Sequence, residues 1–246
     1  MNNMDNIQGE EFFNKIADYH LNPSASHLVD TKVQYWSIQK LLCFIKDENV
    51  LEMGCGDGIW TNEVISRFGH TSVIDISSKL LSSAKKKHGD KITTYQSYFE
   101  EFKPPSSTKF STIIASHVLE HVADPICVLS KMKEWLTPDG VIITIVPNAN
   151  SYHRKLSVLM NIQKSIYDFS ASDQAVGHVR VYDLNSFKKD VALARLTIVY
   201  ERGFFLKTIP NGMMTSYSDE LLKALVDISD VLPADEMANI ALILKH

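Results

Sequence analysis

The sequence predicts an α/β fold in which helices cover both faces of a mostly parallel β-sheet, and three observations support this. Short apolar runs alternate with stretches of helical spacing from residue 49 to residue 146, which is typical of parallel strands joined by helices. A cluster of glycines separates the first run from the first helical stretch. The length of 246 residues is within the single-domain range of such folds. We therefore expect one domain over residues 1–246.

Composition argues against several classes of protein. The formal net charge of −4 makes a general nucleic-acid surface unexpected. The three cysteines, Cys43, Cys55 and Cys127, are odd in number and lack metal-ligand spacing, which favours a reducing compartment. Residues 1–8 lack a signal pattern, and no apolar run is long enough to cross a bilayer. We expect a cytoplasmic protein without nucleic-acid or membrane partners, and the oligomeric state stays open.

The segment before the first strand carries two helical patterns. The apolar positions of the first are Phe12, Phe13, Ile16 and Tyr19, and those of the second are Trp36, Leu41, Leu42 and Ile45. A break at residues 22–26, rich in serine and containing a proline, separates them. The sequence therefore predicts an N-terminal helical cap over residues 1–46.

Strands and helices then alternate along the chain. We expect strands at 49–53, 72–75, 92–97, 110–115 and 141–146, and helices at 59–68, 77–87 and 125–136. The strands are short and apolar, as strands buried on both faces are. Asp124-Pro125 predicts a helix start, because proline suits the first helical position. A helix after Asp183 and strands at 196–201 and 240–244 complete the expected sheet.

Two segments outside this alternation are candidates for substrate contacts. Residues 147–182 form an insertion after the strand at 141–146, and long segments of this kind at a functional rim are usually lids or substrate walls. Residues 203–217 contain Phe204-Phe205 and Pro210-Asn211-Gly212. We expect them to form the opposite wall.

The glycine cluster, Gly54-Cys55-Gly56-Asp57-Gly58, follows a strand and precedes a helix, as nucleotide-binding turns do. The third glycine of a dinucleotide fingerprint would fall at Ile59, and no Gly-Lys-Ser/Thr follows as in a P-loop. Glu52 would repel a pyrophosphate at this turn but suits an ammonium or sulfonium charge. A cationic adenosyl ligand therefore fits better than a phosphate.

Glu52-x-Gly54-x-Gly56-x-Gly58 resembles motif I of the class I S-adenosylmethionine-dependent methyltransferases. The resemblance continues through Ser116–Pro125 and Leu136–Gly140 and covers roughly residues 45–148. It implies a Rossmann-like three-layer sandwich, with a mostly parallel seven-stranded sheet whose last two strands pair antiparallel. It also implies S-adenosylmethionine as the cofactor and S-adenosylhomocysteine as the product. The chain is similar to the broad group that includes quinone-, biotin- and sugar-pathway methyltransferases.

Cofactor contacts are expected at the carboxyl ends of the strands, where ligands bind in open sheets. By resemblance, Asp75 holds the ribose hydroxyls. Tyr98 stands where similar enzymes carry an acid for the adenine amine, so we expect stacking and backbone contacts there instead. Tyr19 and Trp36 of the cap are further candidates, with a place in the core as the alternative. The expected cofactor-binding residues are Tyr19, Glu52, Gly54, Cys55, Gly56, Asp75, Ile76, Tyr98, Phe99, Ser116 and His117.

Methyl transfer from a sulfonium depends mainly on alignment, and a base is needed only for a hydroxyl or a protonated amine. The candidate catalytic residues are His117, His121 and His178. His117 and His121 follow the strand at 110–115, and structural hydrogen bonding is the alternative for both. Two histidines and Glu120 also suggest metal binding, but the sequence shows no third ligand for His117 and His121 at this edge of the sheet. No metal is therefore expected.

His178 lies in the insertion and is the preferred base, or it orients the acceptor. The alternative is a histidine that latches the lid to the sheet. In an extended backbone Arg180 and Tyr182 would share its face. Arg154 and Arg180 could grip a carboxylate or phosphate, although surface ion pairs would explain them equally. Arg154, Arg180 and Tyr182 are therefore the candidate substrate-binding residues.

The resemblance implies methyl transfer to a small-molecule acceptor. Because a rim histidine suits deprotonation of a hydroxyl, we expect the oxygen of a sugar, nucleotide-linked or acidic metabolite. A small-molecule N-methyltransferase and a non-catalytic cofactor-binding partner subunit stay open as alternatives. RNA or protein methylation is disfavoured by the acidic charge balance.

Overall fold

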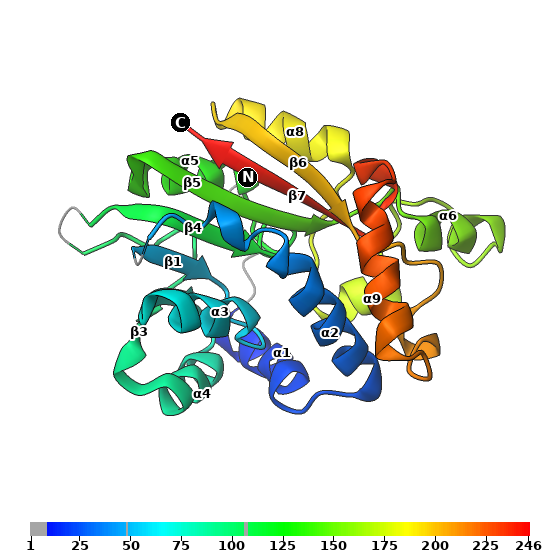
Figure 1. Ribbon diagram of the computed structural model, residues 1–246, viewed down its shortest axis with the longest axis horizontal. Coiled ribbons are helices and arrows are strands. Elements are labelled where there is room, and N and C mark those ends of the chain that lie inside the picture. Colours follow the sequence, from blue (N-terminus) through cyan, green and yellow to red (C-terminus); the bar gives the residue numbers. More distant parts are fainter. Residues whose placement is uncertain (1–8, 48, 106–107) are drawn as a thin grey trace.

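The computed structural model describes residues 9–47, 49–105 and 108–246, so residues 1–8 of the expected cap lie outside it. Figure 1 shows a central twisted sheet with helices packed against both of its faces. Seven strands of the described part form one sheet in the order β3-β2-β1-β4-β5-β7-β6. This confirms the expected Rossmann-like sandwich. No helix in the described ranges is both long enough and apolar enough to span a bilayer.

The strands pair as the sequence and the resemblance predicted. β1, β2, β3, β4 and β5 are parallel, and β7 pairs antiparallel with both β5 and β6. Their bounds are β1 Val50–Met53, β2 Thr71–Asp75, β3 Ile92–Gln96, β4 Phe110–Ser116, β5 Leu136–Pro147, β6 Thr197–Phe204 and β7 Asn239–Lys245. The strand order reverses between β1 and β4, so a crevice is expected at their carboxyl ends. β5 starts earlier than predicted because Leu136 already pairs with Phe110.

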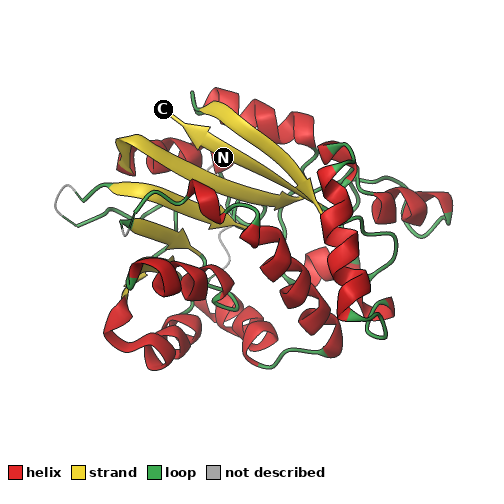
Figure 2. Cartoon of the chain, in the orientation of Figure 1, coloured by secondary structure: helices red, strands yellow, loops and turns green. Residues whose placement is uncertain are grey.

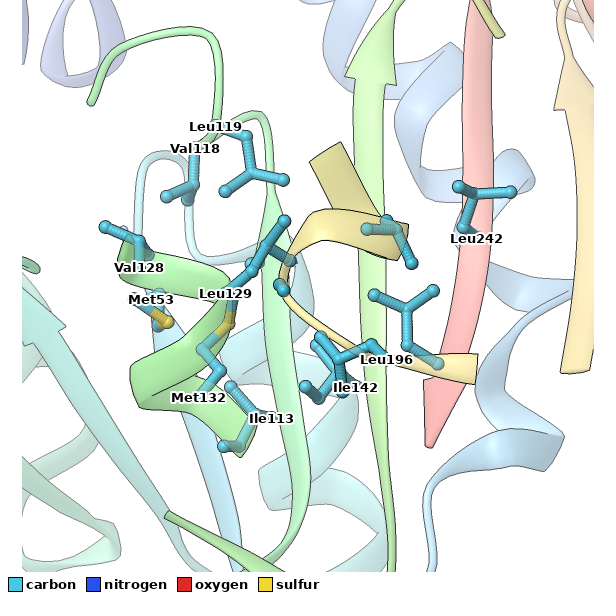
Figure 3. Close-up of a cluster of buried hydrophobic side chains, with 14 of the residues drawn as sticks. Met53, Ile113, Val118, Leu119, Val128, Leu129, Met132, Ile142, Leu196 and Leu242 are labelled. Atoms are coloured by element: carbon cyan, nitrogen blue, oxygen red, sulfur yellow. The ribbon is translucent and has the colours of Figure 1, made fainter. Parts of the chain in front are cut away.

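Helices α5 (Pro125–Trp135) and α8 (Leu184–Leu193) cover one face of the sheet. Figure 3 shows Val128, Leu129 and Met132 of α5 facing strand side chains that include Met53 and Ile113. Each such side chain, once fully buried, contributes about 1.5–3 kcal/mol. The N-cap of α5 is Asp124, whose side chain accepts from the Cys127 N–H at 2.9 Å. The predicted helix start is therefore confirmed.

The opposite face packs against α3 (Ile59–Phe68) and the short 3₁₀ turn η2 (Leu42–Phe44). The cap helices are α1 (Glu10–Leu21) and α2 (Ala25–Gln39), and α1 lies against α4 (Ser78–His88). Helices and the loops between them thus surround the strands on both sides (Figure 2). The second predicted cap pattern is split, because α2 ends at Gln39 and Leu42 already belongs to η2.

The insertion contains α6 (Tyr152–Leu159) and α7 (Ala171–Ala175). Its two ends are held together, because the Ala149 N–H donates to the Tyr182 carbonyl at 2.6 Å. After β6 the chain passes through η4 (Asn211–Met213), α9 (Asp219–Asp227), η5 (Ile228–Asp230) and η6 (Ala234–Glu236) before β7; η3 (Gly89–Lys91) precedes β3. Helix α9 was not predicted from the sequence. It packs beside α2 (Figure 1).

Replacing Gly203 with alanine is expected to lower the free energy of unfolding by about 1–3 kcal/mol, the usual cost of overpacking. A Cβ at this position in β6 would lie 2.7 Å from Cα of Ala234 and also contact its carbonyl oxygen. Backbone atoms cannot move aside as a flexible side chain can. Chemical denaturation checks this, with Gly212→Ala as the matched control, since no atom lies within 4 Å of its Cβ position. Equal losses in both variants would contradict the prediction.

Candidate active site

A cavity of about 1160 Å³ lies at the carboxyl ends of β1, β2 and β4, beneath the cap helices and beside the insertion. Pockets for one drug-sized ligand usually measure about 300–1,000 Å³, so there is room for a cofactor and a small acceptor. All eleven expected cofactor-binding residues line this cavity. Their contacts with the cofactor stay predictions.

The glycine turn adopts the backbone geometry that its composition predicted. Gly54, Gly56 and Gly58 have φ values of 77°, 40° and 73°, a region that side chains disfavour. The Gly54 N–H donates to the Ile74 carbonyl at 2.8 Å, which ties the turn to β2. A Cβ on Gly56 would lie 3.4 Å from the His20 ring, so the cap helix approaches the bare backbone closely.

Asp57 in this turn holds the cap in place, a role not predicted from the sequence. Its carboxylate lies 2.7 Å from Nδ1 of His20 and 2.9 Å from Nε2 of His27, and it accepts from the Thr31 hydroxyl at 3.0 Å. Burial alone would raise the pKa of Asp57, but the bonds to both histidines outweigh this and hold it well below its usual range. The turn and both cap helices are therefore one hydrogen-bonded unit.

The two aromatic candidates from the cap have different positions. Tyr19 lines the cavity, and its ring centre lies 4.1 Å from that of His27. Burial raises the pKa of Tyr19 to about 12, so its hydroxyl stays protonated. Trp36 instead packs against a core cluster that contains Val33 and Leu222. For Trp36 the core alternative is the one observed.

Glu52 is a buried carboxyl group at the end of β1. It is 2% exposed and accepts from the Thr61 hydroxyl at 2.5 Å. Burial is the main cause that raises its pKa to about 8, and the nearby Asp75 adds to it. Without a cation nearby, Glu52 is therefore mostly protonated at neutral pH.

Asp75 ends β2 on the same side of the cavity. Its two carboxylate oxygens accept from the Ser77 N–H at 2.8 Å and the Cys55 N–H at 3.2 Å. These bonds fix the carboxylate while burial raises its pKa. Burial likewise raises the pKa of the Cys55 thiol well above its usual value. This fits a packing role for Cys55 rather than a nucleophilic one.

The strand ends β3 and β4 supply the rest of the expected cofactor wall. Tyr98 and Phe99 follow β3, and the Phe99 ring lies 3.7 Å from the position of a Cβ on Gly54. Ser116 ends β4, and Ile76 follows β2. His117 has a φ of 56°, which for a residue with a side chain is a strained conformation often found at functional sites.

The two histidines after β4 have different environments. Nδ1 of His117 lies 3.3 Å from Oε1 of Glu120. Burial would lower the pKa of His117, but the interaction with Glu120 outweighs it and the pKa is raised. Burial lowers the pKa of His121 to about 4, so this ring is neutral. Its centre lies 4.8 Å from the His178 ring, which brings the insertion against this strand end.

His178 forms a dyad with Asp173, a residue that was not singled out from the sequence. Nδ1 of His178 lies 2.9 Å from one carboxylate oxygen of Asp173, and the other oxygen accepts from Arg154 Nη2 at 2.5 Å. Burial would raise the pKa of Asp173, but His178 and Arg154 hold it well below its usual range. An ionised Asp173 keeps the proton on Nδ1 and leaves Nε2 of His178 as the acceptor.

The three expected substrate-binding residues all bind partners within the protein, and two of them, Arg154 and Arg180, line the cavity. Arg154 is 5% exposed and is held by Asp173 and by the carbonyls of Ile166 and Asp168. Arg180 donates to the carbonyls of Leu119, Val122 and Ala123. Tyr182 is buried outside the cavity, and its hydroxyl donates to Asp190 at 2.8 Å. All three side chains therefore stabilise the insertion. Neither arginine has a guanidinium group free to make the paired hydrogen bonds with which arginine binds a carboxylate or phosphate.

The expected opposite wall is partly present. Phe205 and residues 210–213 line the cavity, whereas Phe204, Met214 and Tyr217 pack in the core. Lys207, which lies between Phe205 and residue 210 in the sequence, also lines the cavity and was not predicted.

Two groups of described residues have the geometry to hold a metal ion. His20, His27 and Asp57 form one, although Asp57 is already satisfied by hydrogen bonds. Glu120, His121 and His178 form the other, with ligand atoms within 4.8 Å of one another. Both carboxylate oxygens of Glu120 are buried, and beyond the contact of Oε1 with Nδ1 of His117 at 3.3 Å they have no partner among the described residues. His178, which lies in the insertion, thus supplies the third ligand that was missing from the sequence pattern.

Comparisons with known proteins identify the family of this chain. A family model described as a methyltransferase domain matches residues 26–201, which is more than half of the chain. The ubiquinone biosynthesis O-methyltransferase of Actinobacillus pleuropneumoniae is 32% identical over 155 residues, which cover 58% of this chain and 64% of that protein. A malonyl-[acyl-carrier protein] O-methyltransferase of Ilyobacter polytropus is 23% identical over 142 residues, 54% of each chain. The matched part is thus less than two thirds of either relative's length.

Two solved structures share the fold over nearly the whole chain. The plantazolicin methyltransferase BamL, in complex with a triazolic desmethylPZN analog and SAH, has a TM-score of 0.60 at 19% identity and 96% coverage of both chains. An S-adenosylmethionine-dependent methyltransferase from Clostridium acetobutylicum has a TM-score of 0.59 at 14% identity, covering 95% of this chain and 97% of its own. Such identities show the fold alone. The match of the family model over residues 26–201 shows that this chain belongs to the methyltransferase domain family.

Proposed function

We propose that this protein transfers a methyl group from S-adenosylmethionine to a hydroxyl oxygen of a small-molecule acceptor. The observation that carries the proposal is that the His178–Asp173 dyad and the glycine turn open into one cavity. Similarity to an O-methyltransferase and to BamL, whose complex contains SAH, supports both the donor and the reaction.

The residues present fit the adenosyl cofactor. Glu52 and Asp75 are buried acids beside a turn of bare backbone, an arrangement that suits a cationic ligand and its ribose hydroxyls. The cofactor, when bound, supplies a methyl group already activated by a sulfonium. Phe99 and Tyr98 then offer aromatic surface to the adenine.

The chain's own residues would contribute alignment and one proton transfer. The cap and the insertion line the cavity, and alignment of donor and acceptor between them can supply much of the rate through effective molarity. Nε2 of His178 accepts the proton of the acceptor hydroxyl as the new carbon–oxygen bond forms. The Asp173 carboxylate orients the ring and stabilises the imidazolium that results, the role an aspartate has in other dyads and triads.

A labelling experiment tests the proposal. The protein is incubated with methyl-labelled cofactor and cell extract, and label is sought in the small-molecule, nucleic-acid and protein fractions. Label in a small molecule, on oxygen by product analysis, is the expected result. Label on nitrogen would make it an N-methyltransferase. Cofactor binding without transfer to any fraction would favour a non-catalytic partner subunit.

Removing divalent metals is expected to leave the rate within about twofold, because alignment rather than a Lewis acid supplies most of the acceleration. Dialysis against a chelator, followed by the same label-transfer assay, checks this. A lost activity that one divalent ion restores would contradict it. The ion would then be assigned to Glu120, His121 and His178, whose ligand atoms lie within 4.8 Å of one another.

A further inference from the structure

Among the lysines and arginines that line the cavity, Lys207 is the one whose side chain has no hydrogen-bond or ion-pair partner among the described residues. The lysine and arginine side chains that line the cavity are Arg154, Arg180 and Lys207. Both arginines are held by backbone carbonyls, and Arg154 also by Asp173. The Lys207 ammonium makes no hydrogen bond or ion pair with a described residue.

The backbone of Lys207 is held by hydrogen bonds of its N–H and its carbonyl, so the point from which its side chain extends is fixed by the fold. Its N–H donates to the Phe205 carbonyl at 2.9 Å, and its carbonyl accepts from the His153 N–H at 3.0 Å. These bonds hold the connection after β6 against the start of α6. Lys207 and His153 therefore stand side by side in the cavity wall.

His153 is a neutral hydrogen-bonding group beside this cation. Its Nδ1 is buried without a partner. Burial lowers the pKa of His153 to about 3, and the charges of Lys207 and Arg154 act in the same direction. A neutral imidazole can donate one hydrogen bond, so the pair offers a charge and a donor, the combination that a carboxylate or phosphate oxygen requires.

The protein itself does not neutralise Lys207 at close range. Asp30 and Asp173 are the carboxylates that act on its charge, yet neither is within ion-pair distance of its ammonium. Asp30 accepts from Asn211 at 3.1 Å, and Asp173 is bound to Arg154 and His178. Burial lowers the pKa of Lys207, which reflects the cost of leaving this cation partly desolvated and unpaired.

We propose that Lys207 and His153 form a subsite for an anionic group, a carboxylate or phosphate, carried by the methyl acceptor. The assignment to the acceptor rests on the proposed function, since the subsite lies on the wall formed by the insertion and the segment after β6. It would make an acidic small molecule the substrate class. Lys207 thus takes the role that the sequence suggested for Arg154 and Arg180.

Anion binding can be measured without methyl transfer. Protein loaded with S-adenosylhomocysteine and labelled with ¹³C at the lysine Cε atoms is titrated with acetate, inorganic phosphate, acetamide or chloride. The Lys207 signal is identified by its absence from Lys207→Met. Lys155 in α6, which is partly exposed and does not line the cavity, is the control in the same sample, identified with Lys155→Met.

Saturable movement of the Lys207 signal with acetate or phosphate, and not with acetamide or chloride, is the expected result. Which of the two anions binds more tightly distinguishes a carboxylate from a phosphate. The proposal is overturned if Lys207 moves no more than Lys155 at equal ionic strength, or if acetamide acts like acetate.

Transfer assays separate this proposal from the proposed function. The labelled product should be retained on an anion exchanger, and Lys207→Met should raise its KM by about tenfold or more with a smaller change in kcat. A neutral product would overturn the assignment to the acceptor. Saturable anion binding without any methyl transfer would instead overturn the proposed function and leave the anion subsite standing.

Discussion

Replacing His178 with alanine is expected to lower the rate of methyl transfer by about 10²–10⁴-fold, the usual contribution of a general base. Affinity for S-adenosylhomocysteine should change little, because His178 belongs to the insertion and not to the glycine turn. Initial rates of label transfer at saturating cofactor measure the first effect, and calorimetry measures the second. A rate within a fewfold of wild type would exclude His178 as the base and leave it as a lid latch.

Two further variants sharpen this test. His88→Ala, at the end of α4 and outside the cavity, is the matched control and should keep full activity. Asp173→Asn should also lower the rate, because an amide no longer holds the proton on Nδ1 of His178 or stabilises its imidazolium. If Asp173→Asn unfolds the insertion instead, thermal melting will show it, since Asp173 also binds Arg154.

The alternation of parallel strands and helices was predictable because its information is local. The parallel strands are apolar runs that lie next to helices in the sequence. The pair Asp124-Pro125 by itself predicts the start of α5, because an N-cap residue is followed by proline at the first helical position. The antiparallel pairing of β6 with β7 came from the resemblance instead. Helix α9 was missed because it buries only Leu222 and Val226, and it packs on α2, which is far away in sequence.

The cofactor side of the cavity was predictable for a similar reason. Residues at the carboxyl ends of parallel strands must meet at one edge, so Glu52, Asp75 and His117 could be grouped without a structure. What each acid does there depends on burial, which the sequence does not give. The raised pKa of Glu52 is an example.

The acceptor side of the cavity was not predictable, because its side chains form hydrogen bonds and ion pairs with residues that are distant in sequence. Arg154 and Arg180 suggested an anion-binding site, yet their guanidinium groups donate to backbone carbonyls, those of Arg154 within the insertion and those of Arg180 in the loop between β4 and α5. Lys207 carries no local signal at all. Asp173 does have a local sequence signal, since Ser170-x-x-Asp173 is a capping-box pattern. The structure has this capping box at the start of α7.

Replacing Glu52 with glutamine is expected to weaken binding of S-adenosylmethionine by about tenfold or more, since hydrogen bonds to charged groups contribute about 1.5–3 kcal/mol. It should also remove a pH dependence. The pKa of Glu52 is raised to about 8 in the empty protein, and a cationic ligand favours the ionised form. Wild-type affinity should therefore rise with pH up to about 8 and then level off, with a proton released on binding at neutral pH. Calorimetry in buffers of different ionisation enthalpy measures that proton.

The stability of the empty protein should change in the opposite direction. Because burial raises the pKa of Glu52 in the folded protein above its ordinary value, the folded state holds this proton more tightly than the unfolded chain does. Its contribution is present at low pH and is lost as pH rises toward 8. Glu52→Gln, which has no proton to lose, should be at least as stable as wild type at pH 8 despite binding the cofactor poorly. Denaturant melts at pH 6 and pH 8 measure this difference in stability, with exposed Glu101→Gln as the control. If the affinity of Glu52→Gln for the cofactor kept the pH dependence of wild type, another group would bind the cation.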